Sequence, residues 1–286
     1  MRHRATFAAL AAALVLAGCS GGLDGIATLS TGTTTTTSST IVAAAPPPSP
    51  APTPPAPPPA TLGAVAPAGL GPGDRGPVVA ALEQRLAALH YDTGRADDAF
   101  DAETANGVVA FQKVSGLPRS GRATQDVMDA LARASAPPPL VPGGGPTRVE
   151  IDLVRQVLFL YQGDALTRII PVSSGTGKRY CSEGKCGIAV TPAGAFRVER
   201  RISGWRKSDL GRLYNPLYFK GGIAIHGFPS VPHQPASHGC VRIPMTAAGS
   251  FPQQVPDGTP VYVLDGKTAP APLGAPPPPP PPRPGG

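Results

Sequence analysis

Proline and glycine are concentrated in a few segments of this 286-residue chain, and these segments limit where a hydrophobic core can form. The chain has 39 prolines and 35 glycines, far above average use. The segments rich in Pro, Gly, Ser or Thr are residues 20–40, 45–60, 136–146 and 269–286. Such segments cannot bury a core, so we interpret them as linkers or disorder. Two segments of globular composition remain, residues 73–135 and residues 147–265.

The start of the chain resembles an export signal. A positively charged beginning precedes an apolar stretch over residues 7–17, which is too short to span a bilayer. Residues 16–19, Leu-Ala-Gly-Cys, resemble the bacterial lipobox, in which the chain is cut before the cysteine and the thiol is lipidated. We expect residues 1–18 to be a signal peptide, and Cys19 to carry a lipid that anchors the exported protein to the outer face of the cytoplasmic membrane. An ordinary signal peptide with a small-residue cleavage site is the alternative.

Export also bears on the other three cysteines. Cys181 and Cys186 flank only four residues, and an oxidising compartment favours a disulfide between them. A metal site is the alternative, but this pair lacks a second pair of ligands nearby. Cys240 then remains as an odd thiol, which in an exported protein indicates reactivity.

The chain has a formal net charge of +7, which suits an acidic surface or polymer as a partner. Six basic residues cluster around one loop: Arg197, Arg200, Arg201, Arg206, Lys207 and Arg212. They could bind the carboxylates of a substrate or form a solvated face, and the sequence leaves both open. We find no aromatic interleaving that indicates nucleic acid, so no nucleic-acid partner is expected.

The first globular segment predicts a small bundle of three short helices. Leucines and valines recur at helical spacing over residues 77–90, which indicates an amphipathic helix. A second helix is expected over residues 102–115, and Thr124 can cap a third.

The same segment resembles the peptidoglycan-binding domain of the first type. The resemblance rests on Gly73-Asp74-Arg75-Gly76-Pro77-Val78-Val79, on residues 86–91 and on Phe111-Gln112-Lys113 with Gly116-Leu117. It implies docking on the glycan or peptide of the cell wall, and a helical spacer without wall affinity is the alternative. The chain departs from the family at His90 and within residues 97–101 (Asp-Asp-Ala-Phe-Asp), where glycines are usual. Aspartate tolerates a left-handed backbone better than most residues, so the fold is expected to persist.

The second globular segment predicts a mainly β domain. Residues 149–153 alternate apolar with polar side chains, and residues 157–160 follow as the second strand of a hairpin. Further strands are expected at residues 166–172, 195–201, 217–225 and 260–264. The helical signal is thin, so a closed or sandwiched sheet with inserted loops is the expected form.

Residues 237–242, Ser-His-Gly-Cys-Val-Arg, carry the main functional signal. A cysteine attacks as the thiolate, and a free thiol with a pKa near 8.5 is mostly protonated at neutral pH. It needs an imidazole to take its proton and backbone N–H groups to hold an oxyanion. His238 lies two positions before Cys240, on the same side of an extended chain. His226 follows a short apolar strand at residues 222–225, so the residues alone leave two candidates for the base.

A zinc site is the alternative use of these side chains. Its ligands would be His226, His233, His238 and Cys240, but their spacing fits no common zinc pattern. We therefore expect no metal, and we interpret His233, which matches no motif, as a surface loop residue.

Four motifs of the second segment look like those of the L,D-transpeptidase catalytic domain (YkuD type), in the same order. They are Glu150-Ile151-Asp152-Leu153, Thr191-Pro192-Ala193-Gly194-Ala195-Phe196, Gly222-Ile223-Ala224-Ile225-His226-Gly227 and Ser237-His238-Gly239-Cys240-Val241-Arg242. The resemblance covers about residues 147–265. It implies a cysteine acyltransferase that needs no cofactor.

The resemblance also implies a role for each motif residue. Cys240 would be the nucleophile, His226 would accept and donate the proton, and the Gly227 carbonyl would hold the imidazole. The backbone N–H groups around Cys240 would line the oxyanion hole, and neighbouring side chains would support the site. These further residues are His238 and Gly239 for the oxyanion hole, and Ser237 and Arg242 for support. Only ten residues separate His226 from Ser237, fewer than in the common family motif, which shortens the loop over the site.

The implied reaction is acyl transfer on peptidoglycan stem peptides, with a tetrapeptide donor and an amine acceptor, giving 3→3 cross-links in cell-wall biogenesis. With water as the acceptor the outcome is L,D-carboxypeptidase activity, and with a protein lysine it is attachment of a protein to the wall. A non-catalytic, wall-binding lipoprotein is the alternative from another class.

These interpretations give one expected layout. It consists of a signal peptide (1–18), a lipidated Pro/Ser/Thr-rich tether (19–72), a peptidoglycan-binding domain (73–135), a linker (136–146), an L,D-transpeptidase catalytic domain (147–265) and a disordered Pro-rich tail (266–286).

Overall fold

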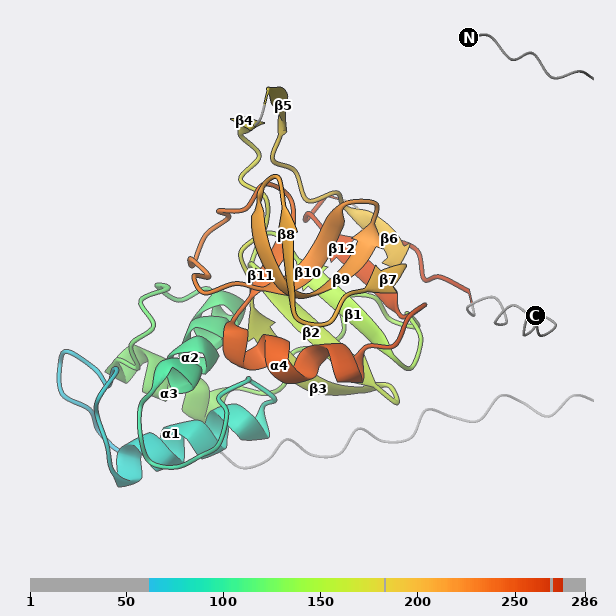
Figure 1. Cartoon of the computed structure of the whole chain (residues 1–286). Coiled ribbons are helices and arrows are strands. Elements are labelled where there is room, and N and C mark those ends of the chain that lie inside the picture. The colour runs from blue at the N-terminus through green and yellow to red at the C-terminus, as the bar shows by residue number, and fades with distance from the viewer. Residues whose placement is uncertain (1–61, 183, 268–269, 275–286) are drawn as a thin grey trace, which may run out of the picture. The chain divides into compact units, whose positions relative to one another are not determined.

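The computed structural model describes residues 62–182, 184–267 and 270–274 (Figure 1). The predicted signal peptide, the lipid attachment at Cys19 and most of the tether and tail lie outside these residues. Within the described part of the chain, no helix has the length and apolar character needed to cross a membrane.

Three short helices come first: α1 (Pro77–Ala88), α2 (Ala102–Ser115) and α3 (Gln125–Arg133). Pro77 opens α1, where its missing N–H group would have no helical partner in any case. The Asp101 carboxylate caps α2 by accepting from two backbone N–H groups of the first turn, and Gly116 ends this helix with a left-handed φ of 69°. The helices predicted at residues 77–90 and 102–115 are confirmed to within two residues.

Two loop residues of the helical segment stand where glycine is usual, and the fold of the segment accommodates both. His90 and Asp98 have left-handed φ angles of 68° and 66°, a region in which His and Asp are enriched among non-glycine residues. The buried Glu83 carboxylate accepts from the backbone N–H groups of Asp97 and Asp98 and so holds the second loop. The departures from the family pattern are therefore compatible with the fold.

Two β-sheets follow. The first has the order β3 (Ala165–Pro171), β2 (Val157–Gln162), β1 (Arg148–Asp152), β12 (Pro260–Leu264) and β6 (Gly194–Arg197). The second has the order β11 (Val241–Ile243), β10 (Ile223–Gly227), β9 (Gly211–Lys220) and β7 (Arg200–Arg201), with β8 (Trp205–Ser208) also paired to β9. A separate hairpin of β4 (Arg179–Ser182) and β5 (Lys185–Ile188) projects at the top of Figure 1.

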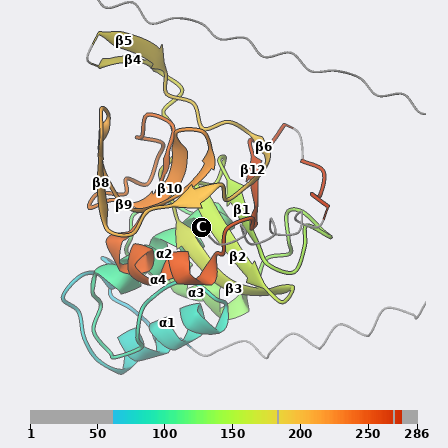
Figure 2. The same ribbon diagram turned by 45° about the vertical axis from the view of Figure 1, so that its right-hand side comes forward.

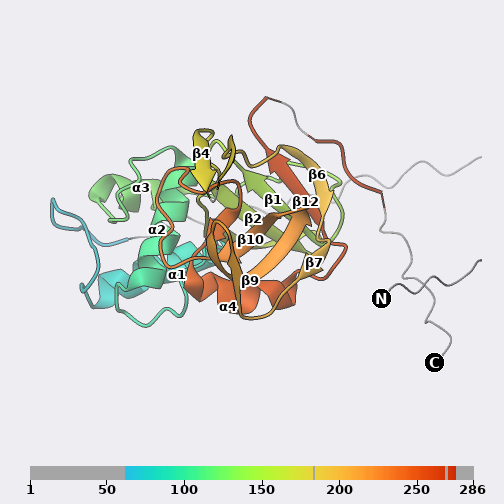
Figure 3. The ribbon, with the colours of Figure 1, turned by 45° about the horizontal axis from the view of Figure 1, so that its top comes forward.

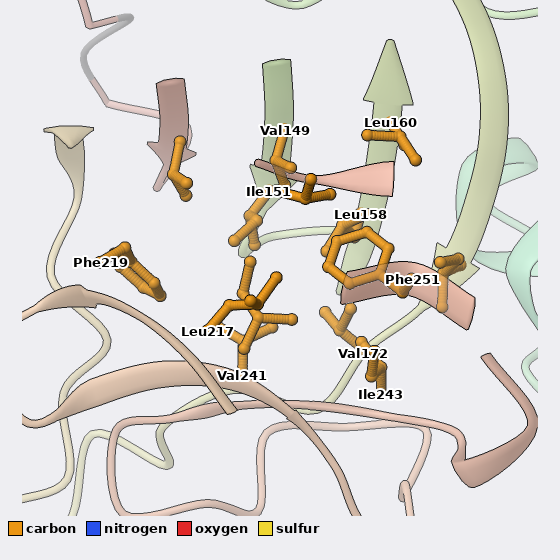
Figure 4. Packing of buried hydrophobic residues seen from close by; sticks show 14 of the residues in the cluster. Val149, Ile151, Leu158, Leu160, Val172, Leu217, Phe219, Val241, Ile243 and Phe251 are labelled. Carbon is orange, nitrogen blue, oxygen red and sulfur yellow. The ribbon is translucent and has the colours of Figure 1, made fainter. Parts of the chain in front are cut away.

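The two sheets face each other across one hydrophobic core, so the sandwiched form is confirmed. Val149 and Ile151 of β1 and Leu158 of β2 lie opposite Leu217 and Phe219 of β9 (Figure 4). Fully burying a side chain of this kind contributes roughly 1.5–3 kcal/mol. This core lies directly behind the strands that carry the candidate site.

The second segment also contains a helix, which the sequence analysis did not predict. Helix α4 (Met245–Gln254) lies against β9 and β10 (Figure 3) and adds Ala247, Ala248 and Phe251 to the core. Its apolar side chains are mostly small and Pro252 lies inside it, so its helical periodicity is weak in the sequence.

Two of the expected strands are each divided in the structure. Residues 217–225 belong to β9 and β10, because Gly221, with a φ of 54°, turns the chain between them. Residues 195–201 belong to β6 and β7, which lie in different sheets. In both cases the sequence located the extended residues but not the change of direction.

Strand β2 is buried on both faces, which joins the helical segment to the sheet. Leu158 and Leu160 point into the sandwich core, whereas Val157, Phe159 and Tyr161 belong to the hydrophobic cluster of the helical segment, where α2 contacts β2. Figure 2 shows the three helices next to β3, with α2 in contact with it. The two globular segments therefore share a hydrophobic cluster, which their separation by a Pro/Gly-rich stretch did not predict.

A buried lysine lies in the contact between α2 and the sheet. The side chain of Lys113 is only 1% exposed, and its Nζ donates to the carbonyl oxygens of Gln156 (3.1 Å) and Val172 (2.9 Å). A neutral amine has two N–H donors, which match these two acceptors. Burial, and to a lesser extent the charge of Arg119, lowers the pKa of Lys113 to about 7.

We expect this lysine to make the stability depend on pH. Above about pH 7 the folded protein has released the Lys113 proton, whereas the unfolded chain keeps it until about pH 10.4, so stability rises with pH between these values. Below pH 7 Lys113 is protonated in both the folded and the unfolded protein, and the cost of burying its charge then lowers the stability by its full amount. The slope from this one group is at most about 1.4 kcal/mol per pH unit.

Denaturant unfolding of the wild type and of Lys113→Met between about pH 7 and pH 9.5 measures this contribution. The variant should lack the additional upward slope, because methionine does not titrate. Equal slopes in the two proteins would show that Lys113 stays protonated when buried.

Candidate active site

The parallel pairing of β10 with β11 brings the two functional motifs together. The register places Ile225 opposite Val241 and His226 opposite Arg242. Ile225 and Val241 point into the sandwich core, so His226 and Arg242 point to the other face of the sheet. Cys240 lies two positions before Arg242 and shares this face. One sheet face therefore carries the cysteine, the histidine and the arginine of the motifs.

The imidazole of His226 is buried and held in one tautomer. Its Nδ1 lies 2.9 Å from the carbonyl oxygen of Gly227, and because a carbonyl can only accept, Nδ1 carries the hydrogen. The neutral ring thus presents an unprotonated Nε2. Burial lowers the pKa of His226 to about 4; the Gly227 hydrogen bond opposes this shift and the charge of Arg242 adds to it. Near neutral pH the ring is able to accept a proton, as a general base must.

The thiol of Cys240 is partly buried and lines the same pocket as this ring. Among the described residues, its hydrogen bond goes to the carbonyl oxygen of Gly222 (3.8 Å) and not to an imidazole. Burial raises the pKa of the Cys240 thiol, while a hydrogen bond from the Ala224 backbone and the charge of Arg242 act in the opposite direction. The resting site therefore holds a neutral thiol and a neutral imidazole, and the thiol donates to the Gly222 carbonyl rather than to the ring.

The turn that presents Cys240 is fixed by two hydroxyl groups. The Ser237 hydroxyl accepts from the Gly239 N–H (3.0 Å) and donates to the Cys240 carbonyl (2.5 Å). The Thr191 hydroxyl donates to the Gly239 carbonyl (2.6 Å), a role that the sequence did not indicate for this motif residue. Gly239 has a φ of 140°, and a Cβ there would meet the Val190 carbonyl oxygen at 2.9 Å, so only glycine fits.

The hydrogen bonds of this turn bear on the expected oxyanion hole. The N–H group of Gly239 is engaged by the Ser237 hydroxyl, so it is not directed at a substrate. The N–H groups of His238 and Cys240 remain as the candidate donors. The side chain of Ser237 shapes this turn, and Ser237 also lines the pocket over the site.

A pocket of about 470 Å³ opens over this face, and His226, His238 and Cys240 line it. The His238 ring is exposed and lies 4.8 Å, between ring centroids, from the ring of Tyr180 on β4. The hairpin of β4 and β5 contains a disulfide between Cys181 and Cys186. The disulfide hairpin therefore contributes a wall of the pocket, which its sequence did not indicate.

The structure divides the six basic residues around the loop into two groups. Arg197 and Arg201 donate to carbonyl oxygens, and Arg201 also forms an ion pair with Asp257. Arg200 lies over the ring of Tyr218, 3.8 Å from its centroid. The other three line the pocket: Arg206, Lys207 and Arg212. Only this second group is placed to meet a molecule in the pocket.

His233 lies in a different contact from the other histidines. Its Nδ1 donates to the carbonyl of Arg119, in the loop between α2 and α3, so it is not the plain surface loop residue that the sequence suggested. In the part of the chain that the structure describes, no three His, Cys, Asp or Glu side chains are grouped so that they could hold a metal ion. The structure brings together His226, Cys240 and Arg242, places His238 at the rim and separates His233 from them.

Comparison with known proteins identifies relatives of both globular segments. A family model described as the L,D-transpeptidase catalytic domain matches residues 146–263, and one described as a putative peptidoglycan binding domain matches residues 75–131. A solved L,D-transpeptidase from Xylanimonas cellulosilytica is 37% identical, with a TM-score of 0.64; the match covers 70% of this chain and 99% of that one. An L,D-transpeptidase from Stackebrandtia nassauensis is 23% identical, with a TM-score of 0.41 and coverage of 72% and 100%. No curated protein matches the chain.

We expect the rate at which the Cys240 thiol reacts to depend on pH as its raised pKa predicts. Alkylation by iodoacetamide, located by peptide mapping, should accelerate continuously from about pH 6 to pH 9, because only the thiolate reacts. Arg242→Gln should slow alkylation several-fold at pH 8, since it removes the positive charge that stabilises the thiolate.

The matched control is Arg95→Gln, which removes a charge from an exposed loop of the helical segment and should leave the rate unchanged. A rate that is already constant below pH 7 would instead reveal a preformed thiolate–imidazolium pair.

Proposed function

The chain belongs to the L,D-transpeptidase family, and we propose that it transfers acyl groups between peptidoglycan stem peptides through a thioester on Cys240. The observation that carries the proposal is the His226 imidazole, which donates from Nδ1 to Gly227 and presents Nε2 on the sheet face that Cys240 shares. A base in a fixed tautomer that lines the same pocket as a free thiol supplies the two groups that nucleophilic catalysis by cysteine needs.

The first half of the reaction forms the thioester. Nε2 of His226 takes the thiol proton as the sulfur of Cys240 attacks the carbonyl that links the L-centre of the third residue to the terminal D-alanine. The N–H groups of His238 and Cys240 hold the oxyanion. When the intermediate collapses, the C–N bond breaks and His226 returns the proton to the leaving amine, so D-alanine departs as a neutral amine.

The second half releases the enzyme. An amine of a neighbouring stem attacks the thioester, His226 accepts its proton, and the thiolate of Cys240 leaves and is reprotonated. The product is a 3→3 cross-link. Attack by water would give L,D-carboxypeptidase activity and attack by a protein lysine would give wall attachment, both through the same thioester.

The charge of the pocket supports a stem peptide as the substrate. Stem peptides carry free carboxylates, and the pocket is lined by Arg206, Lys207 and Arg212 with one acidic side chain, Asp209. Arginine suits carboxylates because its planar fork donates two parallel hydrogen bonds.

The remaining parts of the chain complete the proposal. The segment at residues 73–135 would bind the wall polymer, and a lipid on Cys19 would anchor the exported protein to the outer face of the cytoplasmic membrane. A Pro-rich tether of roughly fifty residues could span on the order of 100 Å and so let the catalytic domain reach into the wall.

Incubating the protein with tetrapeptide stems tests the activity. We expect release of D-alanine and a cross-linked dimer, and Cys240→Ala should abolish both because it removes the nucleophile. A carbapenem should form a covalent adduct that peptide mapping places on Cys240. Release of D-alanine without dimer would favour the carboxypeptidase. Wall binding without release or adduct would leave only the non-catalytic lipoprotein.

The pocket cations give a separate expectation. Arg206→Gln or Lys207→Gln should raise KM for the stem roughly three- to tenfold with little change in kcat, since each removes one charge that meets a substrate carboxylate. Steady-state kinetics at low and high salt measures this, and the difference from wild type should shrink in high salt. Arg197→Gln, which alters the net charge equally outside the pocket, should behave as wild type; an equal effect there would assign the change to overall charge.

A further inference from the structure

The loop at residues 228–239 joins the proposed base to the proposed nucleophile. His226 lies just before it and Cys240 just after it, and the two flanking strands are already paired. The conformation of this loop therefore helps to decide where the sulfur lies relative to the imidazole. The catalytic domain holds both ends of the loop through backbone hydrogen bonds, from the Phe228 N–H to the Ile243 carbonyl and from the Ser237 N–H to the Ser174 carbonyl. Nearer its middle, the Ser173 hydroxyl donates to the Gln234 carbonyl (2.7 Å).

The middle of the loop is held by the helical segment. Arg119, between α2 and α3, donates from Nη1 to the carbonyl oxygen of His233 (3.0 Å). His233 in turn donates from Nδ1 to the carbonyl oxygen of Arg119 (2.5 Å). The two residues are 114 positions apart in the sequence, and their hydrogen bonds are reciprocal. Figures 1 and 3 show this loop, in orange, beside the loop that follows α2.

A second connection runs from the helical segment to the end of the same loop. Lys113 of α2 donates to the Gln156 carbonyl, and the Gln156 side chain bonds both the hydroxyl and the N–H group of Ser174. The Ser174 carbonyl accepts from the N–H groups of Ala236 and Ser237. Ser237 shapes the turn that carries Cys240. Two separate sets of hydrogen bonds thus lead from the helices to the catalytic loop.

We propose that the helical segment positions the catalytic loop, with Arg119 and His233 as the positioning pair. A domain whose role was limited to binding the wall could be joined by a flexible linker and would need no contact with this loop. Here the pair joins the helices to the segment between base and nucleophile. Neither residue touches the reacting atoms; they act by keeping Cys240 and His226 in a reactive arrangement, where a displacement of about 1 Å can cost on the order of a hundredfold in rate.

The test compares four variants of the full-length protein. Arg119→Ala and His233→Leu each remove one side of the pair. His233→Asn retains it, because the asparagine amide can place an N–H donor where Nδ1 lies. Arg122→Ala is the matched control: Arg122 also donates to two carbonyl oxygens, those of Ala68 and Gly69, but within the helical segment.

The readouts separate positioning from stability. In Arg119→Ala and His233→Leu we expect kcat for D-alanine release to fall roughly tenfold with KM within about twofold, and iodoacetamide alkylation of Cys240 to become several-fold faster, since a looser loop exposes the thiol. His233→Asn should restore both rates, because its amide supplies an N–H donor in place of Nδ1. Thermal unfolding should show all variants folded at the assay temperature.

Several results would overturn the proposal. These are unchanged kcat and alkylation in both Arg119→Ala and His233→Leu, an equal loss in Arg122→Ala, or no recovery in His233→Asn. The kinetic readout rests on the proposed function, but the alkylation readout does not. Absence of D-alanine release from the wild type would therefore refute the function, while the change in thiol reactivity would still decide the positioning role.

Discussion

The candidate site depends on the parallel pairing of β10 with β11. In this register Ile225 and Val241 face the hydrophobic core, and that burial decides which face is left for His226 and Cys240. A slip of one residue would turn the histidine into the core and expose the isoleucine, so the core protects the alignment of the catalytic pair. Parallel neighbours cannot be joined by a tight turn, and the connecting loop is therefore part of the site by necessity.

Burial sets the protonation of this site. It raises the pKa of the Cys240 thiol and lowers that of the His226 imidazole, so both shifts disfavour an ion pair in the resting protein. Arg242, opposite the histidine in the register, favours the thiolate and disfavours the imidazolium. The arrangement suits proton transfer during attack on a bound substrate rather than a permanently ionised nucleophile.

The helical segment is part of the same physical unit. Strand β2 shares its Val157, Phe159 and Tyr161 with the helices, and Lys113 lies buried in the contact. The helices are therefore packed against the sheet whose other face covers the sandwich core. If they bind the wall, as their family resemblance implies, that contact would also orient the pocket toward the polymer.

Much of the fold and of the candidate site could be predicted from local sequence. Apolar periodicity located α1, α2 and the strands around the core, and the motifs at His226 and Cys240 indicated thiol chemistry. Helix α4 escaped prediction because its small apolar residues and internal Pro252 give little periodicity, and the division of residues 217–225 escaped because a glycine turn does not change the apolar pattern.

Only the tertiary structure decided which distant segments of the chain lie next to each other. Residue types alone left two histidines as candidates for the base, and the family resemblance favoured His226. In the structure the strand register puts His226 on the sheet face of Arg242, and the ring of His238 is exposed. Nothing in the sequence indicated Arg119 beside His233. Residue type and spacing determine which chemistry a chain can perform and which segments become extended or helical, because these depend on neighbours along the chain. Which distant groups meet depends on how the core packs, and that is settled only when the sheets and helices come together.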